Sequence, residues 1–179
     1  MSRGISKKTK KLTLGALLSA KGVALLIVGS LIETLDLSMA ALASFFCIFA
    51  VIELGGVYPW MIFAVTSLLS VIFMPHSMGG WFYLLFFGYY PILKEKLERL
   101  KKPVSWLIKL GTFNITVLIG VGIAFFLFFG NTEGKTVIDA FLYVFGGEEA
   151  GKWLAIITYL LAHVVFVVYD IALTRLISY

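Results

Sequence analysis

The sequence predicts an all-α membrane protein, a bundle of six transmembrane helices. Of its 179 residues 60% are hydrophobic and 14% are charged, whereas soluble domains carry roughly 25% charged residues. The apolar residues fall into six blocks, and most basic residues lie between or beyond blocks on one side of the expected membrane. We therefore expect one integral membrane domain over residues 1–179, with no separate soluble domain.

The blocks and their breaks place the helices. A bilayer core is about 30 Å thick and is crossed by about 20 helical residues. Gly55 and Gly56 end the second block, Pro75 ends the third, and Pro103 begins the fifth where a missing N–H is tolerated. The spans are expected at residues 12–32, 37–54, 57–74, 79–93, 104–130 and 152–174.

Two connections have more structure than a turn. Near the end of the fourth span, Pro91 predicts a kink, after which a charged stem pairs Glu95 with Arg99 and Glu98 with Lys102 at i,i+4 spacing. The external stretch 131–151 contains an apolar stripe over 136–145 that predicts a short interfacial helix. A lid over a pocket and a plain connector both remain open for this stretch.

The distribution of charge predicts the orientation. With the N-terminus in the cytoplasm, the opposite side holds only Lys135 and Lys152 as basic residues outside the membrane, so the positive-inside rule is met. An even number of spans then places both termini in the cytoplasm of a multi-pass cell-membrane protein. The basic residues on the inner side are Arg3, Lys7, Lys8, Lys10, Lys11, Lys94, Lys96, Arg99, Lys101, Lys102, Lys109 and Arg175.

Catalytic and metal-binding patterns do not emerge from the sequence. The single cysteine, Cys47, excludes an intramolecular disulfide and a cluster or zinc site built on several cysteines. The two histidines, His76 and His163, lie in different segments, and no complete hydrolase or nucleotide-binding motif is present. We expect a protein that is not an enzyme and has no cofactor or metal.

Polar residues within the spans are informative because ionisable groups are costly in lipid. Lys21 lies near mid-depth of the first span, and Asp170 and Glu53 are its candidate partners. A structural ion pair, a substrate counter-ion and a snorkelling lysine remain open for Lys21. Asn114 and His163 lie near mid-membrane on consecutive spans, as a polar pair between helices or as ligand contacts.

Acids, a histidine and amphipathic rings gather at the outer ends of the spans. Such aromatic residues form an interfacial belt or, collectively, the mouth of a pocket for a small polar or aromatic molecule. The acids favour a cationic or hydrogen-bond-donating ligand. With Asn114 and His163, the substrate-binding candidates are Glu33, Asp36, His76, Trp81, Tyr83, Trp153 and Tyr159.

The first span carries small residues four apart in adjoining rows. Gly15 and Ser19 form one row, and Ala16, Ala20 and Ala24 form the other. Small residues let another backbone approach closely, so this inner half is a packing face, either for a helix of the same chain or for a partner.

With these features the chain resembles the substrate-binding S components of energy-coupling factor vitamin transporters, and uncharacterised Firmicutes membrane proteins related to them. The resemblance covers nearly the whole length and includes Ala16-Leu17-Leu18-Ser19-Ala20, which is similar to the family's Ala-x-x-x-Ala element. It implies a six-helix bundle that captures a vitamin-like micronutrient from outside, with the external loops and the outer ends of spans four to six as the binding region. It also implies docking through Ala16 and Ala20 on a transmembrane coupling subunit that is driven by two cytoplasmic ATPases. Lys21, directly after the alanine element, departs from the family pattern.

The sequence therefore favours a non-catalytic substrate-capture subunit. Two other functions remain open: a membrane scaffold or assembly protein without a small ligand, and a self-sufficient transporter that uses Lys21, Asp170 or His163 as an ion relay. Nucleic-acid binding is disfavoured because the basic residues are divided between a tail and a loop.

Overall fold

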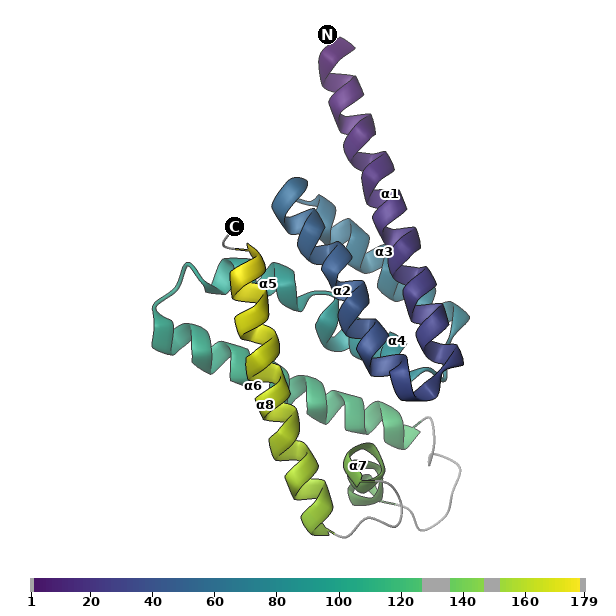
Figure 1. Cartoon of the computed structure of the whole chain (residues 1–179), viewed down its shortest axis with the longest axis vertical. Coiled ribbons are helices and arrows are strands. Elements are labelled where there is room, and N and C mark those ends of the chain that lie inside the picture. Colours follow the sequence, from purple (N-terminus) through teal and green to yellow (C-terminus); the bar gives the residue numbers. More distant parts are fainter. Residues whose placement is uncertain (1, 127–135, 147–151, 178–179) are drawn as a thin grey trace. The chain divides into compact units, whose positions relative to one another are not determined.

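The computed structural model describes residues 2–126, 136–146 and 152–177 (Figure 1). It is 89% helix, and these residues contain no strand. In this part of the chain four helices are long and apolar enough to cross a membrane, namely Lys7–Leu31, Asp36–Glu53, Lys102–Ala124 and Trp153–Leu176. The prediction of an all-α membrane protein is thus confirmed, while the count of six spans and the position of the termini stay predictions.

The chain divides into two compact units, Met1–Lys109 (unit 1) and Leu110–Tyr179 (unit 2). Unit 1 holds α1 (Ser2–Leu31), η1 (Glu33–Leu35), α2 (Asp36–Glu53), α3 (Tyr58–Phe73), α4 (Met78–Phe82), η2 (Tyr83–Phe87) and α5 (Tyr90–Leu97). Unit 2 holds most of α6 (Lys102–Ala124), together with α7 (Val137–Gly146) and α8 (Lys152–Ile177).

Small residues of α1 allow it to pack closely on α2 and α3, the two helices with which it makes most of its contacts. A Cβ atom on Gly22 would lie 3.0 Å from the Thr66 side chain on α3, and one on Gly29 would lie 2.7 Å from the Met39 Cβ on α2. Glycine at these positions therefore removes atoms that would separate the helices.

The turn between α2 and α3 is where the sequence predicts it. Gly55 and Gly56 both have φ of +61°, a conformation that other residues adopt at a cost. The Lys11 Nζ donates a 2.8 Å hydrogen bond to the Leu54 carbonyl oxygen and lies 5.4 Å from the centre of the Tyr58 ring. Lys11 thus ties the N-terminal part of α1 to this turn.

The fourth apolar segment is broken rather than kinked. The π-helical turn η2 follows α4, and α5 then begins with Pro91 in its first turn, where a proline leaves no helical hydrogen bond unmade. The break therefore precedes Pro91. At Gly88, within the break, a Cβ would come within 2.6 Å of the Phe63 ring, so the backbone passes very close to α3 there.

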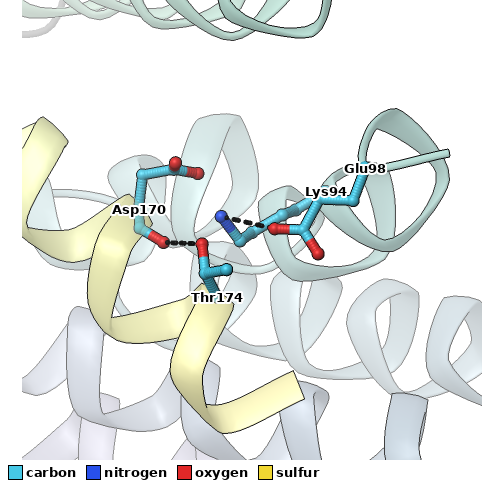
Figure 2. Close-up of polar contacts among 4 residues, drawn as sticks. All are labelled: Lys94, Glu98, Asp170 and Thr174. Carbon is cyan, nitrogen blue, oxygen red and sulfur yellow. Dashed lines mark hydrogen bonds and ion pairs between the residues drawn. The ribbon is translucent and has the colours of Figure 1, made fainter. Parts of the chain in front are cut away.

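The charged stem carries two i,i+4 ion pairs. Arg99 and Glu95 pair at 2.5 Å as predicted. Glu98 pairs with Lys94 at 3.0 Å, one turn back, instead of with Lys102 (Figure 2). The Lys94 side chain is fully buried. Lys94 and Lys102 are both four residues from Glu98, so the spacing of charges alone does not reveal which lysine pairs with it.

In unit 2 one core cluster contains Val117, Val121 and Ala155, and α7 packs on α8. The short helix predicted over 136–145 is confirmed by α7. The Asp139 carboxylate accepts a 2.5 Å hydrogen bond from the Thr136 N–H, and the Thr136 hydroxyl oxygen accepts one of 3.4 Å from the Asp139 N–H. This reciprocal cap sets the start of the helix. The rest of the predicted loop, 131–135 and 147–151, lies outside the described residues.

Candidate functional site

A pocket of about 480 Å³ lies within unit 2, between α6, α7 and α8. Its size falls in the range of small-molecule sites, roughly 300–1,000 Å³. The lining is almost wholly apolar, with polar groups only at Asn114 and Tyr159. The lining residues are Asn114, Val117, Leu118, Val121, Val137, Ile138, Phe141 and Tyr159.

Helical spacing explains why these residues meet. Val117 and Leu118 lie three and four residues after Asn114, and Val121 lies four and three residues after them, so the four residues form one stripe of α6. The apolar stripe of α7, which the sequence predicts as an interfacial face, provides the opposite wall.

Asn114 and Tyr159 form the polar edge of the pocket. The Tyr159 hydroxyl donates a short hydrogen bond to the Asn114 Oδ1, and the Asn114 Nδ2 donates one of 2.9 Å to the Leu110 carbonyl oxygen. A carboxamide has two N–H donors and an oxygen that accepts two hydrogen bonds. One donor and one acceptor position of Asn114 therefore remain for a bound molecule.

His163 lies one turn beyond Tyr159 on α8, in an aromatic setting. Its Nδ1 lies 3.0 Å from the Tyr159 carbonyl oxygen, and because a carbonyl only accepts, the Nδ1 carries the proton. Its ring meets those of Tyr159 and Phe113 edge to face at centroid distances of 4.5 and 4.8 Å. The polar partner of Asn114 is thus Tyr159. His163 packs its ring against that of Tyr159 and does not pair with Asn114.

Asp36 has a different environment, in unit 1. It is nearly buried, and its carboxylate accepts hydrogen bonds from the Ser77 hydroxyl at 2.9 and 3.0 Å and from the Gly79 N–H at 2.7 Å. The Ser77 oxygen in turn accepts a 3.3 Å bond from the Gly80 N–H. Asp36 thereby fastens the start of α2 to the start of α4, which is a structural use of a carboxylate.

The other candidates at the outer ends are dispersed. His76 is exposed, Trp81 is half-buried with its Nε1 donating to the Pro75 carbonyl at 2.8 Å, and Trp153 is 79% exposed. Tyr83 is completely buried against Leu26, Ala40 and Ala43, in the core of unit 1. The backbone of Glu33 lies in η1, and its side chain is outside the described residues. Within unit 2 the structure brings together Asn114, Tyr159 and His163.

The two small-residue rows of α1 have opposite environments. Gly15 and Ser19 are buried, whereas Ala16, Ala20 and Ala24 are exposed. The first row packs within unit 1, and the second forms a ridge, Ala16–Ala20–Ala24, on the surface of the helix. We call this the alanine ridge.

Of the two candidate partners of Lys21, only Glu53 lies with it in unit 1. Lys21 is exposed and Glu53 is exposed at the end of α2, and within the described part of unit 1 the two form no ion pair. Asp170 is 2% exposed on α8, where its carbonyl oxygen accepts a 2.9 Å bond from the Thr174 hydroxyl (Figure 2). A pair between Lys21 and Asp170 would join the two units and stays a prediction.

Sequence reasoning missed several residues that the structure uses. Ser77 and Gly79 hold the Asp36 carboxylate, and Lys94 is the most deeply buried lysine among the described residues. The Ser77-x-x-Gly80 start of α4 was visible as a capping pattern, but nothing in the spacing of the stem marks Lys94 as buried. Among the described residues no three His, Cys, Asp or Glu side chains gather as a metal site would require.

Comparisons with family models, with curated proteins and with solved structures identify no match to this chain. The family that the sequence resembles therefore stays a prediction.

Proposed function

We propose that this chain is a membrane-embedded substrate-capture subunit of an energy-coupling factor type uptake transporter. In this function unit 2 binds a small, vitamin-like molecule in its pocket, and α1 docks on a transmembrane coupling subunit served by two cytoplasmic ATPases. The chain carries no energy source of its own in this proposal, in keeping with the lack of a complete nucleotide motif in its sequence.

The observation that carries the proposal is the division of α1 into a packed row and an exposed row. Gly15 and Ser19 already face neighbouring helices of unit 1, so the close packing that they permit is used within the chain. The alanine ridge is left on the surface, where a second helix backbone can approach without displacing a large side chain. Lys21 is exposed beside it and provides a charge at the edge of the contact.

The pocket supports the capture of a small molecule and indicates its chemistry. Six of its eight lining residues are aliphatic or phenylalanine side chains, and both polar ones lie together. A largely apolar ligand with one hydrogen-bonding group at Asn114 and Tyr159 would satisfy this lining, because a ligand that covers these two polar groups must replace the water bonded to them. The described lining of the pocket contains no acid, so it gives no support to a cationic ligand.

Two measurements test the proposal. Ala16→Leu and Ala20→Leu are expected to reduce co-purification of the coupling subunit, whereas Ala172→Leu, at an exposed alanine of α8, should leave it unchanged. Mass spectrometry of small molecules retained by the purified protein should find one defined micronutrient, and less of it in Asn114→Ala. Unchanged co-purification by both ridge variants would refute the docking role, and repeated empty preparations would favour the scaffold.

The self-sufficient transporter remains the second candidate because of α8. His163 and Asp170 lie on this helix seven residues apart, so they share one face, and Asp170 is nearly fully buried. That function predicts uptake without an ATPase partner, and loss of uptake in Asp170→Asn or His163→Gln.

A further inference from the structure

The N-terminal half of α1 carries a second pocket, an open groove of about 490 Å³ within unit 1. Thr9, Lys10, Thr13, Leu14 and Leu17 line it. Their chemistry changes along the helix from a cation and two hydroxyls to two leucines. The lining runs from Thr9 to Leu17, or about 12 Å of helix.

The contacts of Lys11, next to Lys10 in the sequence, indicate the membrane layer in which the polar end of this groove lies. Its Nζ bonds to the Leu54 carbonyl at the end of α2, beside the Tyr58 ring. Lys96 and Trp60 form a similar pair, with the Nζ 5.5 Å from the ring centre. Lysines over Tyr and Trp rings are typical of the interface between headgroups and acyl chains. Lys10, the neighbour of Lys11, lies at the same level on another side of α1.

The lysines at this level differ in whether they contact other residues of the bundle. Lys11 is used within the bundle, whereas Lys7, Lys8 and Lys10 are exposed. The first acidic residue of the sequence is Glu33, so α1 itself contains no acid to neutralise them. Within the described part of unit 1, Lys10 has no carboxylate within ion-pair distance. An anion from outside the chain would therefore stabilise this end of the helix.

We propose that this groove binds an anionic phospholipid. Its phosphate contacts the Lys10 ammonium, with Lys7 one turn away adding to the attraction, and one acyl chain lies over Leu14 and Leu17. Lys7–Leu31 is about 37 Å long, against a hydrocarbon core of about 30 Å, so the first turns of α1 extend into the headgroup layer. The leucines favour a lipid over a free phosphate because a free anion gains nothing from an apolar wall.

The experiment is native mass spectrometry of the full chain in neutral detergent, titrated with phosphatidylglycerol and, in parallel, with phosphatidylcholine. The Lys10→Gln variant should bind phosphatidylglycerol about fivefold more weakly, since one lysine near an anionic surface contributes about that factor. Lys8→Gln is the matched control: it removes the same charge about 200° around the helix, outside the lining of the groove. If both variants weaken binding equally, the attraction is a general property of the basic end and the groove site is refuted.

A second pair of variants tests the acyl contact. Leu17 and Leu12 are 51% and 50% exposed, but only Leu17 lines the groove. Leu17→Asn should weaken phosphatidylglycerol binding, while Leu12→Asn should not. Displacement of the lipid by inorganic phosphate, or equal binding of phosphatidylcholine, would also overturn the proposal. These titrations need neither a micronutrient nor a coupling subunit, so their outcome is independent of the proposed transport function.

Discussion

The phenolic hydroxyl of Tyr159 donates a hydrogen bond to the amide oxygen of Asn114, joining α8 to α6 across 45 positions of the sequence. The bond forms the polar edge of an otherwise apolar pocket. It also explains the position of His163, whose ring packs on that of Tyr159 and whose Nδ1 is directed at the Tyr159 carbonyl. A single interhelical bond thus organises the candidate ligand site of unit 2.

Removal of this bond should reduce stability by a measurable amount. In a double-mutant cycle of Asn114→Ala and Tyr159→Phe, we expect a coupling energy of about 0.5–1.5 kcal/mol, typical of hydrogen bonds between membrane helices. Unfolding of the four proteins in detergent, followed by circular dichroism, gives the coupling directly. A coupling of zero would mean that the two side chains do not interact in the folded protein.

Gly79 should tolerate no side chain. A Cβ at this position would lie 2.6 Å from the Asp36 carbonyl oxygen and closer still to its carboxylate, so Gly79→Ala should lower the free energy of unfolding by roughly 1–3 kcal/mol. Gly122→Ala is the control, because a Cβ on this α6 residue meets nothing within 4 Å. The control should be neutral or stabilise by up to about 1 kcal/mol, since alanine favours helix. Equal effects of the two substitutions would contradict the close approach of α4 to Asp36.

The two ion pairs of the stem should differ in their contribution. Lys94 is fully buried, so Lys94→Ala leaves a cavity and removes the partner of Glu98, and we expect a loss of about 3 kcal/mol. Arg99→Ala breaks a pair of the same spacing whose arginine is 76% exposed, and about 0.5 kcal/mol or less is expected. Thermal unfolding of both variants in the same detergent compares the two losses of stability. A loss for Arg99→Ala as large as that for Lys94→Ala would show that burial of the cation does not determine how much an ion pair of the stem contributes to stability.

The six-span topology predicts that both ends of the chain lie in the cytoplasm. In a Cys47→Ala background, which removes the single native cysteine, cysteines placed at the exposed positions Lys8 and Arg175 should react with an impermeant maleimide in inverted vesicles and not in intact cells. Labelling of either position from outside would refute the topology and, with it, the proposed direction of capture.

The sequence could predict the helices because the signals involved are local. Long apolar runs identify α1, α2, α6 and α8, and Gly55 with Gly56 marks the turn after α2. The stripe around Phe141 likewise identifies α7, whose face lines the pocket. Each of these patterns depends on hydrophobicity or backbone preference within a few residues.

The candidate site was only partly predictable. Asn114, Tyr159 and His163 each stand out in the sequence as a polar or aromatic residue in an apolar span, and the structure brings these three together. Tyr83, an aromatic residue near the end of its span like Tyr159, is instead a core residue that packs with Leu26 and Ala43. A belt position and a core position have the same local sequence signature.

The sequence by itself determined that the described part of this chain is helical, that its helices suit a membrane and that small residues form two adjoining rows along α1. Only the tertiary structure decided that Gly15 and Ser19 are packed while Ala16 and Ala20 are exposed, that Asp36 caps α4, and that Lys94 is buried with Glu98. The physical reason is the distance along the sequence over which each property is determined. Hydrophobic periodicity is a property of neighbouring residues, whereas burial and hydrogen-bond partners depend on which distant helices meet.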